Sequence, residues 1–289
     1  MSTPEDPAVG QVVNTTRYPL SDPASNDWKY VVSRTRRELH EFGCSVLPDF
    51  LRPSLRDALR QECATIAPLA YYDVETVNVY NIATDSPLPA DHPGRIAMRR
   101  GNAFVAQDHI PENFIIRQLY SSELFKQFIA SCVELPELYE LADPLAGLCL
   151  NVLTPGMEHP WHFDTNEFAV TLLTQEPQDG GGFEYCPNIR SAHAENFDNV
   201  RAVLDGRGAH LVRRLSLRPG DLQLFKGRYS LHRVSTVHGE TARHSAIFAY
   251  SERPGVIGSV ARTKQIFGRV LPQHLAAEGH AVRVDQLLD

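Results

Sequence analysis

The sequence lacks the long apolar run that marks a membrane protein. No stretch of its 289 residues approaches the roughly 18 to 20 consecutive apolar residues that a membrane span needs. The opening MSTPEDPAVGQ also lacks the basic region and apolar run of a secretion signal. We therefore expect neither membrane insertion nor secretion.

Cysteine is scarce, and it never occurs as C-x-x-C. The five cysteines are odd in number and widely spaced, at positions 44, 63, 132, 149 and 186. This usage does not resemble a disulfide framework or a thiolate metal site, and it favours buried free thiols in a reducing compartment. The sequence therefore predicts a cytoplasmic protein.

A cluster of charge of one sign is also missing. Asp and Glu outnumber Lys and Arg by 35 to 28, and the basic pairs at 36–37, 99–100 and 213–214 are scattered. This balance disfavours a nucleic-acid partner. Hydrophobic residues make up 43% and charged residues 22%, which is typical of a folded protein with a sizeable core.

No internal repeat or linker divides the chain. Four prolines among polar residues predict a flexible N-terminal arm over residues 1–26. Residues 27–289 are expected to form a single domain, with a helical part at 27–146, a β core at 147–251 and a C-terminal tail at 252–289. The tail is expected to fold over an active-site mouth or to serve as an edge or dimer element, so a homodimer is possible.

Helical and strand patterns occupy separate halves of this domain. Apolar spacing predicts a helix from Asp27 to Phe42 that ends at Gly43, a second over residues 55–66, and a third beginning at Ser121 or Ser122. After Gly147, about seven short apolar or alternating runs follow one another, with a helix or long loop between 193 and 205. The fold class is therefore α+β with a mainly β core, an antiparallel sandwich or barrel with the helices packed outside.

The segment HPWHFDTNEF carries the strongest chemical signal. His162 and Asp164 are two residues apart, so both point to the same side of an extended chain and can bind one metal ion. His232, 68 residues after Asp164, is the candidate third ligand. Two histidines and one carboxylate on one face of a metal form the site typical of non-haem Fe(II) oxygenases.

Other histidines compete for these positions. His159 would have to partner Asp164 at a spacing of five, which does not share a face. His238 and His244 are expected at the surface, because His244 is out of phase with Arg243 and His238 leads into a turn. The aromatic residues beside the first ligand, Trp161 and Phe163, point the opposite way and are expected to pack in the core.

Arg243 is a second signal, eleven residues after His232. On a strand it would share a face with Ser245 and point into the β core, where an unpaired cation is costly. Such a residue needs an anion, and a guanidinium suits a carboxylate. An internal ion pair to Asp or Glu is the alternative.

With these residues the chain resembles the Fe(II)/2-oxoglutarate-dependent dioxygenases, whose core is a double-stranded β-helix, or jelly roll. The resemblance covers about residues 147–251. The family's H-x-D…H motif matches His162, Asp164 and His232, and its R-x-S motif matches Arg243 and Ser245. The family's Gly-Gly turn and P-G-D turn match residues 180–182 and 219–221, in the family's order.

The resemblance implies an enzyme that binds Fe(II), 2-oxoglutarate as co-substrate and O2, and that ascorbate stimulates. The triad would hold the metal and Arg243 the distal carboxylate of 2-oxoglutarate, with Ser245 adding a hydroxyl. Asn151 and Thr171 are further candidates for contact with 2-oxoglutarate, with ordinary ladder roles as the alternative. Candidate substrate residues are Arg99, Arg100, Arg117 and Asn166, although a solvated basic turn is the alternative for the adjacent pair Arg99 and Arg100.

The resemblance also implies a reaction and a class of substrate. Hydroxylation of a small molecule, such as an amino acid or a biosynthetic intermediate, is expected, with release of succinate and CO2. Desaturation, cyclisation and epimerisation are the alternative outcomes. Halogenases of the family replace the carboxylate ligand with a small residue, so Asp164 argues against halogenation. Nucleic-acid demethylation is disfavoured because that branch of the family is expected to have a second arginine six residues after Arg243, and this position is Ala249. A non-oxidative, cupin-like metal-binding protein or isomerase is the alternative.

Overall fold

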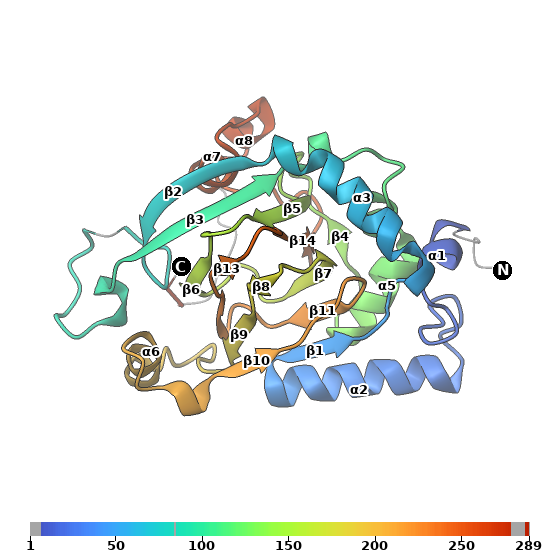
Figure 1. Ribbon diagram of the computed structural model, residues 1–289. Coiled ribbons are helices and arrows are strands. Elements are labelled where there is room, and N and C mark those ends of the chain that lie inside the picture. Colours follow the sequence, from blue (N-terminus) through green and yellow to red (C-terminus); the bar gives the residue numbers. More distant parts are fainter. Residues whose placement is uncertain (1–6, 84, 279–286, 289) are drawn as a thin grey trace.

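The computed structural model describes residues 7–83, 85–278 and 287–288 of the chain (Figure 1). The helices are α1 (Pro7–Val12), α2 (Asn26–Phe42), α3 (Arg56–Ile66), α4 (Ile115–Tyr120), α5 (Glu123–Cys132), α6 (Phe197–Leu204), α7 (Val260–Phe267) and α8 (Pro272–Ala276). Within the described residues, helices α1 to α5 precede the β core at 147–251, α6 interrupts it, and α7 and α8 follow it.

Two antiparallel sheets form the β core. The large sheet has the order β1 (Cys44–Leu47), β11 (Leu222–Phe225), β7 (Ala169–Gln175), β14 (Arg243–Phe248), β5 (Leu148–Leu153), β3 (Met98–Val105) and β2 (Tyr71–Val77). The small sheet has the order β10 (Arg213–Leu215), β9 (Phe183–Cys186), β12 (Leu231–Val234) and β6 (His159–His162). Short pairs join β8 (Asp179–Gly180) to β13 (Val237–His238), and β4 (Tyr139–Glu140) to β15 (Tyr250–Ser251).

The two faces of the large sheet differ in character. Helices α2, α3 and α5 pack on its outer side, where apolar residues of the sheet and the helices share one core (Figure 1). The inner side faces the small sheet, and aromatic contacts such as Phe183 to Phe225, with ring centroids 5.1 Å apart, join the two. The predicted fold class, a mainly β core with helices packed outside, is confirmed.

The helix ends follow their capping residues. The hydroxyl of Ser25 accepts from the backbone N–H of Trp28 at the start of α2, and Gly43 ends the helix in the left-handed conformation. At α5 the hydroxyl of Ser122 accepts from the N–H of Phe125. These boundaries agree with those predicted for the first and third helices, and α6 occupies the interruption predicted between 193 and 205.

The N-terminal segment is packed rather than loose, so the predicted flexible arm is wrong over the described residues 7–26. Val12, Tyr18 and Leu20 are buried in the main core, and Val13 forms a β-bridge to Leu51. Pro7 begins α1, and Pro19 and Pro23 lie in the connection between Tyr18 and α2, where the N–H of Asp22 donates to the carbonyl of Pro19. Residues 1–6 lie outside the described part of the chain.

The C-terminal segment packs against the large sheet at its β2–β3 end. Helix α7 lies against β2 and β3, and Phe267 joins a small core with Ala106, Leu145 and Cys149. The predicted tail is therefore folded over residues 260–276, while 279–286 and 289 lie outside the described residues. None of the helices in the described ranges has the length and apolar character of a membrane span. All five cysteines are buried free thiols, as predicted.

Candidate metal centre

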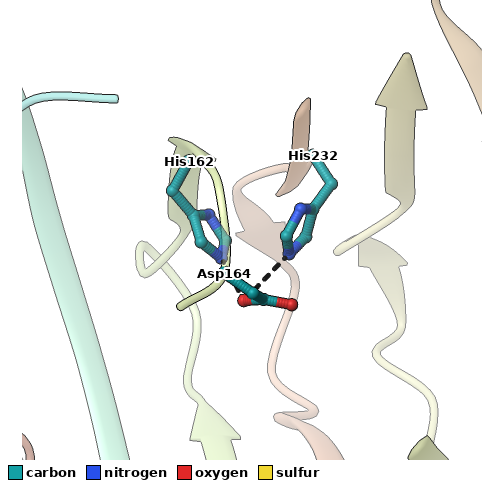
Figure 2. Close-up of side chains that lie close together, drawn as sticks. All are labelled: His162, Asp164 and His232. Carbon is teal, nitrogen blue, oxygen red and sulfur yellow. Dashed lines mark ion pairs between the residues drawn. The ribbon is translucent and has the colours of Figure 1, made fainter. Parts of the chain in front are cut away.

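Three side chains converge at the end of the small sheet (Figure 2). His162 ends β6, Asp164 follows two residues later, and His232 lies on β12 directly opposite His162 in the antiparallel register. The possible ligand atoms of the three residues lie within 4.8 Å of one another. The structure therefore brings together the three residues that the sequence nominated.

Backbone carbonyls orient both imidazoles. The Nδ1 of His162 lies 2.8 Å from the carbonyl oxygen of Pro160, and the Nδ1 of His232 lies 3.0 Å from that of Ser230. Each Nδ1–H therefore donates to the chain, and each Nε2 faces Asp164. The Nε2 atoms lie 3.6 Å and 3.5 Å from the carboxylate Oδ1 of Asp164.

The charge states suit a divalent cation. Burial and the neighbouring His232 lower the pKa of His162 to about 4, so this imidazole is neutral at pH 7. Burial opposes ionisation of Asp164, but His232 and His162 hold the pKa of its carboxyl well below the usual range. One carboxylate and two imidazole nitrogens on one side are a donor set that fits Fe(II) with open positions for other ligands.

Gly227 is required by the position of Asp164, and sequence reasoning missed it. A Cβ at position 227 would lie 1.8 Å from Oδ2 of Asp164, and the carbonyl of Gly227 accepts the N–H of Asp164 at 3.1 Å. Any side chain here would displace the carboxylate. The only sequence signal is one glycine between Lys226 and Arg228, which no spacing rule connects to Asp164.

Aromatic residues support the ligands from both sides. The ring of His232 lies 4.7 Å from that of Phe225 and 5.7 Å from that of Phe183, both on the inner face. Trp161 and Phe163 alternate with the ligands and are buried in a separate core beneath them, as predicted. The ligands thus sit between two packed layers.

Arg243 lies on the inner face of β14 without a carboxylate partner among the described residues. It is 5% exposed, and burial alone lowers the pKa of its guanidinium to about 10. The glycine turn predicted at 180–182 gives it room, because a Cβ on Gly181 would lie 3.2 Å from its Cδ. The alternative of an internal ion pair therefore finds no support in the described residues.

The other candidates for 2-oxoglutarate share this inner face. Ser245 is two residues from Arg243 and opposite Asn151 in the register, and Thr171 bonds Gln223 across the sheet at 3.1 Å. Asn151 donates to the carbonyl of Ala103 at 3.1 Å and to the side-chain oxygen of Asn102. The Nδ2 of buried Asn102 has no hydrogen-bond partner in the described part of the chain, so β3 adds a polar group that the sequence did not single out.

A charged cluster, consisting of Glu75, Arg100 and Arg262, lies beside the ligands. Arg100 on β3 forms an ion pair with Glu75 on β2, and α7 places Arg262 against these strands. Burial lowers the pKa of Arg262 to about 10, and the charges of Arg100, Asp164 and Glu75 act on it. Sequence reasoning nominated Arg100 but missed Glu75 and Arg262, which only the tertiary fold brings close.

The remaining candidates do not join the ligands as a group. Arg99 is exposed on the outer side of β3, so only Arg100 of the pair points inward. Arg117 lies on α4 and lines a surface hollow with Asp108, His109 and Glu112, none of which belongs to the triad. Asn166 is half-buried in the bend after Asp164.

The competing histidines take other positions. His159 stacks on the ring of His162, with centroids 3.8 Å apart, but it is not one of the three converging ligands. His238 is exposed as expected. The expectation for His244 is wrong, since it is 4% exposed, because the outer face of β14 is covered.

Comparisons with known proteins identify a family and similar folds. The model of the family described as HalD: Halogenase D matches residues 27–264. AviO1 from Streptomyces viridochromogenes Tue57 is a similar solved structure, 17% identical, with a TM-score of 0.51 over 76% of this chain and 94% of that chain. SnoK, described as a non-heme alpha ketoglutarate dependent carbocyclase from nogalamycin biosynthesis, is 15% identical, with a TM-score of 0.50 over 77% of this chain and 87% of that chain. A search of curated proteins gives no match. At these identities the structures establish a shared fold.

Proposed function

The chain belongs to the Halogenase D family, and we propose that it hydroxylates a C–H bond of a small molecule, such as an amino acid or a biosynthetic intermediate. The predicted class, an Fe(II)/2-oxoglutarate-dependent dioxygenase, agrees with the shared fold and with the candidate metal site. The observation that carries the proposal is the pairing of a complete His-Asp-His triad with a buried arginine that has no carboxylate partner in the described residues.

The site residues divide the binding tasks between them. His162, Asp164 and His232 would hold Fe(II), and Arg243 with Ser245 would hold the distal carboxylate of 2-oxoglutarate. The bound metal, 2-oxoglutarate and O2 supply oxidation of a substrate C–H bond, with formation of succinate and CO2. The protein orients the ligands through the carbonyls of Pro160 and Ser230, and its aromatic walls exclude water.

Asp164 favours hydroxylation over the halogenation that the family name suggests. A halide ligand needs a position at the metal that a carboxylate would otherwise take. In this chain Asp164 would take that position, and a Cβ at position 227 would lie only 1.8 Å from its Oδ2 atom. A site built so closely around a carboxylate supports an oxygen-transfer reaction.

The charged cluster supports a substrate with a carboxylate. Arg100 and Arg262 contribute two positive charges beside the ligands and Glu75 contributes one negative charge. Once a metal neutralises Asp164, the cluster retains a positive charge that an acidic group of the substrate would balance. Replacing Arg262 with Gln is expected to raise KM for the substrate more than it lowers kcat.

The acidic composition supports a small-molecule substrate rather than a nucleic acid. The buried free thiols support a cytoplasmic location. Ascorbate is expected to stimulate turnover by keeping iron reduced. A homodimer is proposed as the assembly to test by sedimentation, since strand β2 forms an edge of the large sheet with Tyr71 and Tyr72 exposed.

The test is succinate release with Fe(II), 2-oxoglutarate, O2 and ascorbate against pooled amino acids and metabolites, with chloride present. Mass spectrometry of the product separates addition of oxygen from addition of chlorine. Asp164→Ala should abolish release. Asp57→Ala is the matched control, because Asp57 is a strongly exposed carboxylate on α3 and should leave release unchanged.

The outcomes separate the candidate functions. A hydroxylated product that is lost only in Asp164→Ala supports the proposal, whereas a chlorinated product from the unaltered chain contradicts it. The cupin-like alternative is tested without O2, because binding of Fe(II) and 2-oxoglutarate gives a visible charge-transfer band. Metal binding without that band would favour the cupin-like protein.

A further inference from the structure

An ion pair between Arg190 and Glu195 binds the backbone of Leu288, near the end of the described residues. Arg190 and Glu195, in the loop before α6, form a pair with Nη1 and Oε2 3.0 Å apart. The Nη1 of Arg190 also donates to the carbonyl of Leu288 at 3.0 Å, and the N–H of Leu288 donates to Oε1 of Glu195 at 2.7 Å. Both backbone groups of Leu288 are therefore bound by this pair, which we call the C-terminal latch (Arg190, Glu195 and Leu288).

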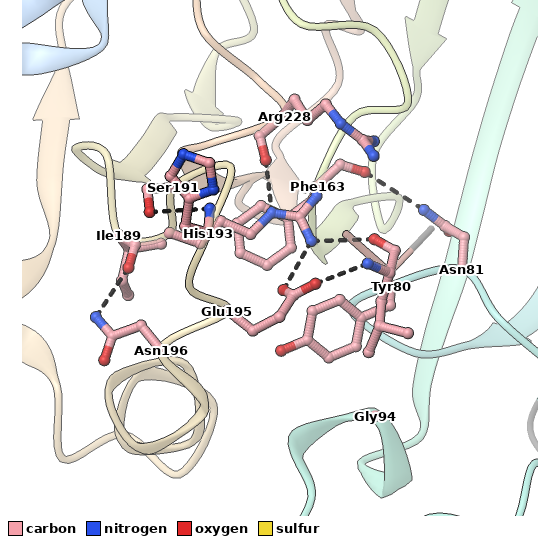
Figure 3. Close-up of polar contacts among 12 residues, drawn as sticks. Tyr80, Asn81, Gly94, Phe163, Ile189, Ser191, His193, Glu195, Asn196 and Arg228 are labelled. Atoms are coloured by element: carbon pink, nitrogen blue, oxygen red, sulfur yellow. Dashed lines mark hydrogen bonds and ion pairs between the residues drawn. The ribbon is translucent and has the colours of Figure 1, made fainter. Parts of the chain in front are cut away.

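The latch contacts the segment that carries two metal ligands. The guanidinium carbon of Arg190 lies 3.8 Å from the ring centroid of Phe163. The ring of Tyr80 also stacks on the ring of Phe163, with centroids 5.7 Å apart and planes at 16° to each other. Glu195, Phe163 and Tyr80 lie together in Figure 3. Because Phe163 stands between His162 and Asp164 in the chain, the position of its ring constrains both ligands.

The backbone around Phe163 is fixed by further contacts. Its N–H donates to the carbonyl of Val79 at 3.1 Å, and its carbonyl accepts from the side chain of Asn81 at 3.5 Å (Figure 3). Arg190 also donates through Nε to the carbonyl of Arg228, one residue after Gly227, at 2.6 Å. The guanidinium therefore joins both segments that position Asp164.

We propose that the C-terminal latch is a positioning element of the metal centre, so that the contacts of Leu288 with Arg190 and Glu195 set the affinity of the triad for its metal. The inference rests on the proposed function only in taking the triad as a metal site. Arg190 acts through Phe163 and the backbone at 228, and it touches none of the ligands. Outer-shell partners of metal ligands typically change metal affinity by about 10-fold to 100-fold when removed.

The test compares the full chain with a chain shortened to end at residue 286. Co(II) is the probe, titrated without O2 or 2-oxoglutarate, and its visible absorption reports both affinity and ligand geometry. The shortened chain should bind Co(II) about tenfold more weakly and with an altered spectrum. Glu195→Gln, which replaces one carboxylate oxygen with an amide NH2, should have a similar effect. Combining the two changes should add little, because both break the same latch.

Val200→Ala is the control for stability alone. Val200 is fully buried in the same core as Phe163 but takes no part in the latch. The Tm of the Val200→Ala variant should therefore fall, while its Co(II) affinity should stay unchanged. Unchanged Co(II) affinity and spectrum in the shortened chain would overturn the proposal, as would fully additive effects of the two changes. If shortening prevents folding, Glu195→Gln alone decides by the same criteria. Failure of the unaltered chain to bind Co(II) would instead contradict the metal site and thus the proposed function.

Discussion

Two buried arginines on the two sides of the triad have opposite surroundings. Arg190 is 2% exposed and has Glu195, the carbonyls of Arg228 and Leu288, and the ring of Phe163 around its guanidinium. Arg243 is 5% exposed and has no carboxylate partner among the described residues. Similar burial therefore accompanies one charge that has a carboxylate partner and one that has none among the described residues.

The comparison teaches how to separate structure from function in a buried charge. Removing a guanidinium from water costs several kcal/mol unless a partner offsets it. The chain supplies that partner at Arg190, whereas at Arg243 a bound carboxylate would supply it. Replacing each arginine should consequently affect different measurements.

The largest expected effect is the loss of stability when Arg190 is replaced. Arg190→Met keeps an unbranched apolar side chain but leaves the mostly buried carboxylate of Glu195 without its ion-pair partner, so the free energy of unfolding should fall by about 3–5 kcal/mol. Urea denaturation of the metal-free chain measures it. The control is Arg207→Met, since Arg207 is 67% exposed in its ion pair with Asp205 and should change stability by less than about 1 kcal/mol. Equal losses in the two variants would remove the contrast on which the comparison depends.

Arg243 is expected to affect ligand binding with little loss of stability. Arg243→Met removes charge-assisted hydrogen bonds of about 1.5–3 kcal/mol each, so 2-oxoglutarate affinity should fall by roughly 100-fold or more. The free energy of unfolding should stay the same or rise, because a buried unpaired charge is lost. Calorimetric titration of the Co(II)-loaded protein measures the affinity. A large loss of stability with normal affinity would mean that Arg243 is structural.

The sequence predicted the parts of the site that have a local or ordered signature. His162 and Asp164 share a face of one strand, and the order of His232, Arg243 and Ser245 follows a known motif. Helices over 26–42 and 123–132 were predictable from apolar spacing and from Ser and Gly caps. In each case the signal lies in neighbouring residues or in a fixed order along the chain.

The rest depended on contacts between distant segments. Glu75, Arg100 and Arg262 meet only because α7 folds back over β2 and β3. The need for Gly227 arises from the approach of Asp164, 63 residues earlier, and no local pattern encodes that approach. His244 was misjudged because alternation places it on the outer face of β14 but does not reveal that helices and other strands cover that face.

The pH dependence of stability tests whether the charge of Arg243 acts on the neighbouring His244. Burial and the charge of Arg243 lower the pKa of His244 from 6.5 to about 4, so the unfolded chain takes up this proton first as pH falls. The stability that His244 contributes is thus complete above about pH 6.5 and is lost as pH falls towards 4, by about 3 kcal/mol. Denaturation of His244→Gln at several pH values should show a correspondingly weaker pH dependence than the unaltered chain. In Arg243→Met the folded-state pKa of His244 should rise, so the loss should still begin near pH 6.5 but end at a higher pH and be smaller. An identical profile would show that the charge of Arg243 does not reach His244.

The smallest expected effect concerns Gly227. It tests whether the fold holds Asp164 in place before a metal binds. Gly227→Ala places a Cβ where Oδ2 of Asp164 now lies, so the carboxylate must rotate or the 227–228 backbone must shift. Co(II) affinity should fall about tenfold, which is the effect of misplacing one ligand without removing it. Gly10→Ala is the matched control, because a Cβ there meets no atom within 4 Å and should leave Co(II) affinity unchanged. Full affinity in Gly227→Ala would mean that Asp164 finds the metal from more than one position, and the triad would then be organised by the metal rather than by the fold.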